Sequence, residues 1–172
     1  MEIRLIKTAD VNMLAAYYEK NADHFEKWQP KYESDYYSVS QLKKRLSTFL
    51  IAQHKGRAAY FVAIEKGEII AQCSLTNIIY GPLKAGHIGY SVDSEFEGTG
   101  LMTRICKETI NYAFNTLKLN RLMAAYMPHN ARSKALLKKL MFTKEGRAKK
   151  YLQINGKWED HVLTSLVNPE NT

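Results

Sequence analysis

Two stretches of the sequence combine residue types and spacings that could do chemistry. The first is a loop in which Gly98 and Gly100 lie two residues apart, between an apolar run ending at Val92 and a helical pattern from Leu101. A helix N-terminus presents unpaired N–H groups and a positive dipole end, and glycine lets the backbone approach a ligand closely. The loop could therefore hold a phosphate, although a turn shaped only by its glycines fits these residues equally well.

The loop does not match the two best-known phosphate-binding motifs. No Lys-Ser/Thr pair follows Gly100, as a Walker loop requires, and position 103 is Thr where Gly-x-Gly-x-x-Gly has its third glycine.

The second stretch places Asn130 and Ser133 three residues apart at the start of a predicted helix, so that their side chains can reach the same side. On the residues alone, an N-cap role for Asn130 and a first-turn donor role for Ser133 are favoured. Eight cations lie from Arg132 to Lys150, opposed only by Glu145. Such a run usually forms a solvated face and can also bind anionic groups.

Length and composition limit what these stretches can belong to. The chain has 172 residues, a formal charge of +8, 45% apolar residues and 24% charged residues. These values predict one domain over residues 1–172 and exclude a disordered or collagenous chain. Cys73 and Cys106 are distant in sequence and lack a His at ligand spacing, so neither a disulfide framework nor a metal site is expected. Without a secretory signal or a run of about 18 apolar residues, we expect a cytoplasmic protein with no membrane contact.

Apolar periodicity predicts the elements that must position the two stretches. Alternation and β-rich runs predict strands over residues 2–7, 58–64, 69–80, 85–92, 119–127, 142–154 and 158–167. Spacings of three and four predict helices from residue 8 to about 20, and over 38–54, 99–117 and 130–140. The segment from 21 to 37 holds five aromatic residues and predicts at most a short helix and a loop. Asn155-Gly156 predicts a tight hairpin turn, and the order β-α-α-β-β-β-α-β-α-β-β indicates a mixed α/β domain.

This order resembles the GNAT superfamily of acetyl-coenzyme A-dependent N-acetyltransferases. Glu97-Gly98-Thr99-Gly100-Leu101-Met102 lies where that family has its Gln/Arg-x-x-Gly-x-Gly/Ala pyrophosphate loop, with Glu97 and Met102 departing from the pattern. The ribosomal-protein-alanine N-acetyltransferase branch is similar over nearly the whole chain. That similarity is carried by Trp28-x-Pro30, Ile88-Gly89-Tyr90-Ser91, Tyr126-Met127-Pro128-His129-Asn130-x-Arg132-Ser133, and Asn155-Gly156-x-Trp158-x-Asp160-His161-Val162-Leu163-Thr164.

The resemblance implies a fold and a site. The fold is α/β (α+β), with a twisted, mostly antiparallel mixed sheet of about seven strands, helices on both faces, and a splayed strand pair that holds acetyl-coenzyme A. The implied cofactor contacts are Tyr90, Ser91, Val92, Glu97, Gly98, Thr99, Gly100, Leu101, Met102, Thr103, Asn130 and Ser133. Ser133 is implied as the general acid for the leaving thiolate. A glutamate that serves as base in some relatives aligns with Leu152 here, so no base is carried over.

The acceptor implied by the branch is the N-terminal alanine amine of a ribosomal protein. The aromatic set Trp28, Tyr32, Tyr36 and Tyr37 falls on the acceptor side in this family, and we expect it to wall the peptide site. One alternative is acetylation of a small amine such as a polyamine, an antibiotic or an amino acid. Another is a basic ribosome- or RNA-binding module without catalysis, which the +8 charge would also suit. Direct nucleic-acid binding is expected to be secondary.

Overall fold

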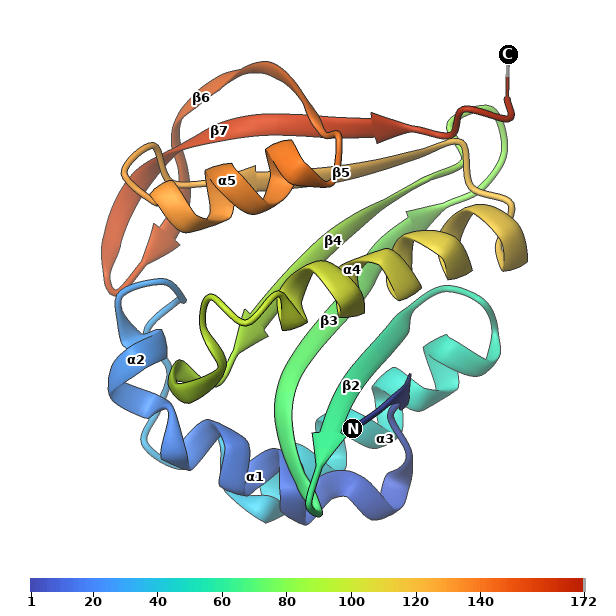
Figure 1. Ribbon diagram of the computed structural model, residues 1–172. Coiled ribbons are helices and arrows are strands. Elements are labelled where there is room, and N and C mark those ends of the chain that lie inside the picture. The colour runs from blue at the N-terminus through green and yellow to red at the C-terminus, as the bar shows by residue number, and fades with distance from the viewer. Residues whose placement is uncertain (172) are drawn as a thin grey trace.

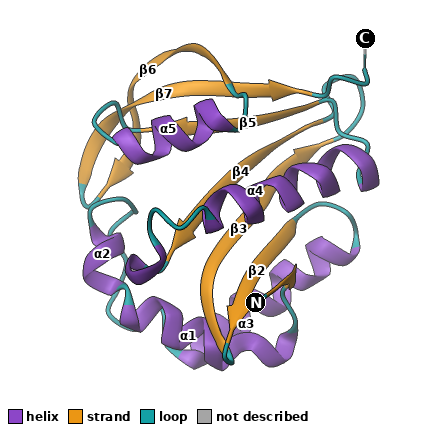
Figure 2. Ribbon diagram, viewed as in Figure 1, coloured by secondary structure: helices purple, strands orange, loops and turns teal. Residues whose placement is uncertain are grey.

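The structure, a computed structural model, describes residues 1–171. Its centre is one seven-stranded sheet (Figures 1 and 2). The strands are β1 (Glu2–Leu5), β2 (Ala59–Glu65), β3 (Glu68–Ile79), β4 (Ala85–Val92), β5 (Arg121–Tyr126), β6 (Thr143–Ile154) and β7 (Lys157–Val167). The helices are α1 (Val11–Lys20), α2 (Ala22–Glu26), α3 (Val39–His54), α4 (Leu101–Asn111) and α5 (Ala131–Lys139).

The strand order in the sheet is β1-β2-β3-β4-β5-β7-β6. Every neighbouring pair is antiparallel except β4 and β5, which run parallel. This parallel pairing extends only from Ala85–Arg121 to His87–Met123, and the two strands continue beyond it without pairing to each other. A fork therefore opens in the middle of the sheet, between the remaining residues of β4 and those of β5.

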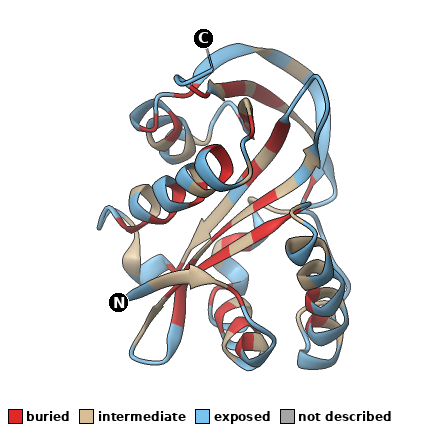
Figure 3. Ribbon diagram, turned by 90° about the vertical axis from the view of Figure 1, so that its right-hand side faces the viewer, coloured by how far each residue is buried: buried red, intermediate tan, exposed pale blue. Residues whose placement is uncertain are grey.

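Two apolar cores lie on opposite faces of the sheet. On one face, α4 and α5 cover β3, β4 and β5 through buried residues such as Ile105, Leu122 and Leu137. On the other face, α1, α2 and α3 bury Leu14, Phe25 and other residues against β2. Figure 3 shows these two helical layers on either side of the sheet, with buried residues concentrated where helix meets strand.

Local sequence signals account for several boundaries. Ser38 caps α3 by accepting a hydrogen bond from the Gln41 N–H. Asn155 and Gly156 both have positive φ, at 44° and 78°, as a two-residue type I′ hairpin turn between β6 and β7 requires. These features confirm the sequence-based expectations of a helix from residue 38 and a hairpin at 155–156.

The predicted fold class is confirmed, with two local differences. The helix expected over 99–117 is α-helical only to Asn111 and continues as a π turn, Tyr112–Thr116, that ends on a Leu117 N–H to Tyr112 C=O bond. The two cysteines, distant in sequence, are buried and free with their Sγ atoms 3.8 Å apart across β3 and α4. Among residues 1–171, no helix is both long and apolar enough to cross a membrane.

Candidate active site

A groove at the fork between β4 and β5 contains most of the predicted site. This groove, called here the loop groove, has a volume of about 650 Å³ and runs between the β4 end, the 97–103 segment and the start of α5. All the predicted cofactor residues line it except Thr99 and Leu101. Thr99 turns its hydroxyl back to the Phe96 carbonyl, and Leu101 is buried in the core beneath the loop.

The glycines of the loop leave its inner surface open. Gly98 has φ of 73° and Gly100 has φ of 84°, and a Cβ built on either would meet nothing within 4 Å. Gly100 is the N-cap of α4, so the first N–H groups of that helix point out beside an uncovered backbone. With Arg132 and Lys139 on the groove wall, this is a fitting cradle for an anionic phosphate group.

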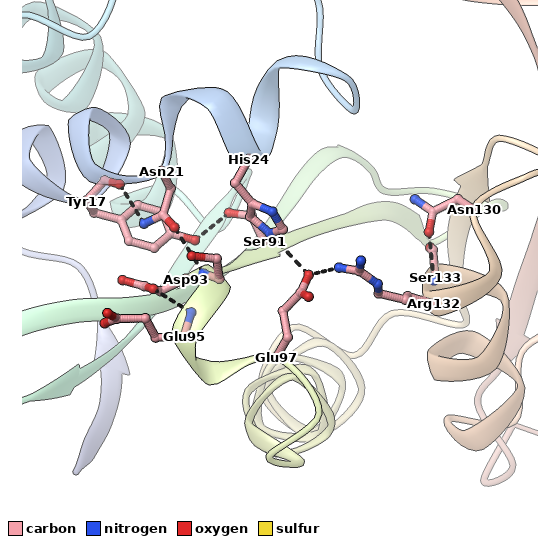
Figure 4. Close-up of polar contacts among 11 residues, drawn as sticks. Tyr17, Asn21, His24, Ser91, Asp93, Glu95, Glu97, Asn130, Arg132 and Ser133 are labelled. Atoms are coloured by element: carbon pink, nitrogen blue, oxygen red, sulfur yellow. Dashed lines mark hydrogen bonds and ion pairs between the residues drawn. The ribbon is translucent and has the colours of Figure 1, made fainter.

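Glu97, one of the two departures from the family pattern, is paired with other side chains in this cradle. Its carboxylate forms an ion pair with Arg132 of α5 and lies 3.2 Å from His24 Nε2 of α2. Figure 4 shows Glu97 between these two side chains, so that one carboxylate links three separate segments. Because Arg132 is largely exposed, the pair is screened by water and is easily exchanged for another anion.

Ser133 lies on the opposite wall of the groove, where α5 begins. Asn130 caps this helix by accepting the Ser133 N–H at 3.0 Å, so the capping role considered for Asn130 is confirmed. The Ser133 hydroxyl is 2.6 Å from the Tyr90 hydroxyl, which reaches it from β4 across the fork. Burial raises the pKa of Tyr90, so its phenol stays protonated and can return a proton to Ser133.

A second cavity, called here the aromatic hollow, opens on the α1 side of the same strand end. Its volume is about 390 Å³, and it shares Phe25, Trp28, Tyr90 and Ser91 with the loop groove. Its remaining wall includes Tyr18, Tyr32, Tyr36, Tyr37, Arg45, Tyr60 and Gln72. All four aromatic residues expected at the acceptor side therefore line this hollow.

Among the described residues that line the aromatic hollow, one side chain is charged, that of Arg45. The Arg45 guanidinium lies 3.6 Å from the centre of the Tyr36 ring and donates a hydrogen bond to the Tyr36 carbonyl, while Tyr32 stacks on Tyr36 at 3.8 Å. None of the described lining residues is an Asp, a Glu or a His. The hollow thus offers rings, hydroxyls and a single cation to whatever enters it.

Residues 28 and 29 contact two C-terminal loops near the place where the two cavities meet. The Trp28 ring stacks on His129 of the β5–α5 loop, with centroids 5.8 Å apart. The neighbouring Gln29 carbonyl accepts the Asn155 N–H from the β6–β7 turn at 3.0 Å. Residues 28–29 therefore join the N-terminal helices to both C-terminal loops.

The carboxylates near the loop have separate roles. Glu95 is exposed, whereas Asp93 is buried at the entry to the short 3-10 helix Ser94–Phe96. Asp93 forms a 2.9 Å ion pair with Lys20 of α1 and accepts the Glu95 N–H at 3.0 Å. Burial by itself would raise the pKa of Asp93, but Lys20 and this hydrogen bond together hold it below its usual range.

Asp160, which is part of the C-terminal stretch that resembles the family, has a structural role. It accepts hydrogen bonds from Arg147 and from the Lys150 N–H, which fixes the bulged part of β6. The cations between Arg132 and Lys150 fall into two groups. Arg132 and Lys139 line the loop groove, whereas Lys144, Lys149 and Lys150 are exposed on β6.

Sequence reasoning missed the partners of the site residues. Tyr90–Ser133 and Tyr17–Ser91 each join residues more than forty positions apart, and no local pattern relates them. Arg45 and His24 were missed as well. The signal for Arg45 was its place among the apolar positions of α3, facing the aromatic segment.

A mixed seven-stranded sheet that splays at its single parallel pair, with a glycine loop and helix N-terminus beside the fork, defines the acetyltransferase class of α/β fold. Residues 1–143 match the acetyltransferase (GNAT) domain family. The chain is 38% identical to the [ribosomal protein uS5]-alanine N-acetyltransferase of Escherichia coli (strain K12), over 99% of this chain and 89% of that enzyme. The chain belongs to the GNAT acetyltransferase family and is an N-acetyltransferase.

Two solved structures are similar over almost the whole chain. The crystal structure of ribosomal-protein-S5-alanine acetyltransferase from Vibrio fischeri is 42% identical with a TM-score of 0.95, covering 99% of this chain and 94% of that one. Mycobacterium smegmatis RimJ in complex with CoA-disulfide is 28% identical with a TM-score of 0.91, covering 98% of this chain and 82% of that one. The sequence-based assignment to this branch of the family is confirmed.

Proposed function

We propose that this protein transfers the acetyl group of acetyl-coenzyme A to the N-terminal amine of a ribosomal protein, with alanine as the first residue. The observation that carries the proposal is the meeting of the two cavities at Tyr90 and Ser91. There a donor in the loop groove and an acceptor in the aromatic hollow would reach the same point. The acetylated protein named for the Escherichia coli and Vibrio fischeri relatives supports this acceptor. It also supports a cytoplasmic location, and the continuous sheet supports one acetyltransferase domain over the chain.

Acetyl-coenzyme A would supply the acetyl group as a thioester. The residues present fit it: the Gly98–Gly100 backbone, Arg132 and Lys139 would hold its phosphates, and the fork would admit its extended arm. N–H groups near Val92, at the unpaired edge of β4, would polarise the acetyl carbonyl. Ser133 would protonate the departing sulfur, and Tyr90 would restore the Ser133 proton.

The aromatic hollow favours a peptide over a polyamine. A polyamine carries several positive charges, and binding it requires carboxylates to replace its lost water. The described lining has no carboxylate and carries Arg45, which repels cations. An N-terminal amine has a pKa of about 8, so a fair fraction arrives neutral at pH 7 to 8 and needs no strong base in the site.

A direct test compares acceptors with the purified protein and acetyl-coenzyme A. We expect mass spectrometry to find one acetyl group on a peptide beginning with alanine, and turnover of spermidine to be at least about 100-fold lower. Equal or faster acetylation of spermidine would overturn the peptide assignment. In cells, deleting the gene should remove one acetyl group from the N-terminus of one ribosomal protein.

A further inference from the structure

Tyr90 and Ser91 are consecutive residues of β4, so their side chains point to opposite faces of the sheet. The Tyr90 hydroxyl meets Ser133 on the α5 side. The Ser91 hydroxyl meets Tyr17 of α1 on the other side (Figure 4). The strand end therefore carries one hydroxyl toward the leaving-group side and one toward the aromatic hollow.

The contacts of Ser91 determine what its oxygen can do. Gln72, the register partner of Ser91 on β3, donates a hydrogen bond from Nε2 to the Ser91 Oγ at 2.9 Å. Tyr17 lies on the other side of this oxygen, with its hydroxyl 2.8 Å away, and is buried. If Ser91 donates its proton to Tyr17, one lone pair on Oγ is filled by Gln72 and one remains for a donor in the hollow.

A neutral amine can donate an N–H bond to this remaining lone pair of the Ser91 Oγ. To attack the acetyl carbon, its nitrogen must direct its lone pair at the carbonyl while its N–H groups bond to acceptors elsewhere. Ser91 lines both cavities, so its Oγ lies beside the point where the amine and the acetyl group would meet. Of the other hydroxyls that line the hollow, those of Tyr18 and Tyr60 are bonded to each other at 3.0 Å, that of Tyr37 donates to Gln29, and that of Tyr90 is bonded to Ser133.

We propose that the Ser91 side chain, held by Gln72 and Tyr17, accepts an N–H bond from the neutral acceptor amine and so orients its lone pair toward the acetyl carbon. This inference rests on the function proposed above and assigns the Ser91 side chain to acceptor binding, so that the cofactor contact expected at Ser91 would be made by its main chain. The N–C bond forms as the C–S bond breaks. One amine proton leaves to water, and the sulfur takes one proton from Ser133, which is replaced from water through Tyr90.

The hydroxyl network orients the amine and does not remove its proton. Burial raises the pKa of Tyr17, Tyr18 and Tyr60, so none of these phenols becomes a phenolate at neutral pH. Arg45 is the one charged side chain among the described residues of the hollow, and it is always protonated. The pH dependence of turnover should therefore follow the neutral fraction of the substrate amine.

The test uses three variants of the full chain. Ser91→Ala removes the oxygen and should lower kcat with an alanine-initiated peptide about 10-fold, the value of one well-placed hydrogen bond. Its affinity for coenzyme A, measured by calorimetry, should change less than about 2-fold. Ser91→Thr keeps the hydroxyl and should recover most of the turnover. Ser74→Ala is the matched control, because Ser74 lies on β3 outside both cavities and bonds only to the Gly89 carbonyl.

Three results would overturn the role of Ser91. They are unchanged turnover in Ser91→Ala, a loss of coenzyme A affinity as large as the loss of turnover, and a pH–rate profile whose shape differs from that of the unmodified protein. The last result would make Ser91 part of a proton-removing chain. Failure of the proposed function has a separate signature, because the unmodified protein would then leave the peptide unacetylated.

Discussion

The loop groove and the aromatic hollow meet at the end of β4, yet different residue types line them. The groove consists of glycines, a helix N-terminus and charged side chains from the β4–α4 loop and α5. The hollow consists of stacked rings and hydroxyls from the N-terminal helices, with Arg45 as its single described charge. The groove suits one fixed anionic ligand, and the hollow suits an uncharged chain end whose shape must be selected. Changes on one side should therefore separate affinity for coenzyme A from turnover of the peptide.

The largest effect is expected at Gly100. Gly100→Glu places a carboxylate in the proposed phosphate cradle and should weaken coenzyme A binding by at least about 100-fold in calorimetry. Gly67→Glu is a matched control, since Gly67 also has positive φ, at 81°, and open space around it, but lies in the β2–β3 turn. Both variants should lose about 1–2 kcal/mol of stability from backbone strain. Equal losses of affinity in both would remove the loop from the binding site.

The next effect separates chemistry from binding within the groove. Ser133→Ala should lower kcat about 50-fold, below the usual range for a general acid because the Tyr90 hydroxyl lies adjacent. Affinity for coenzyme A should stay within about 3-fold, as measured by calorimetry. Ser47→Ala, an exposed serine on α3, should leave both quantities unchanged. Normal turnover in Ser133→Ala would exclude Ser133 as the proton donor.

A smaller effect concerns the ion pair across the groove. Arg132→Ala should weaken coenzyme A binding about 5-fold, because one charge-assisted contact to a phosphate is lost. Glu97→Gln should strengthen binding about 3-fold, since Arg132 and His24 are released and no carboxylate faces the phosphates. Both changes in coenzyme A affinity should become smaller at high salt, because salt screens exposed charges. Weaker binding in Glu97→Gln would show instead that Glu97 holds the groove in its working shape.

The smallest effect on turnover is expected at Asp93, which joins the β4–α4 loop to α1 through Lys20. Asp93→Asn should lower the free energy of unfolding by about 1–3 kcal/mol at pH 7. Because the folded-state pKa of Asp93 is depressed, its contribution is complete above its ordinary pKa of about 4 and is lost as the pH falls through the lowered value. Urea unfolding should therefore show the two proteins converging below pH 4. Glu95→Gln, at the exposed partner of Lys20, should change stability little at any pH.

The difference between the groove and the hollow also explains how much of the site could be predicted from the sequence alone. The groove has local signals: Gly98 and Gly100 mark a turn before a helix, and Asn130 precedes Ser133 by the spacing of a cap. The strands were predictable because alternation is also local, and Asn155-Gly156 defines its own turn. Each of these features depends on residues within a few positions of each other.

The hollow has no comparable signals, because its contacts form only after the sheet and helices assemble. Tyr17 meets Ser91 across 74 positions, and the buried Asp93 is paired with Lys20, which comes from α1. The aromatic segment could be assigned to the acceptor side only through the family resemblance. The stack of Trp28 on His129 could not be predicted from local sequence, because it forms only when the β5–α5 loop lies beside Trp28.

The fork between β4 and β5 has a consequence for the exchange of backbone amide protons. Beyond His87 and Met123 the facing edges of these strands lack each other as hydrogen-bond partners, and unpaired edges attract added backbone. A ligand arm carrying amide groups can take the place of the missing strand. Deuterium uptake along the facing edges should then fall when coenzyme A is added, while uptake at the continuous β2–β3 pair stays the same.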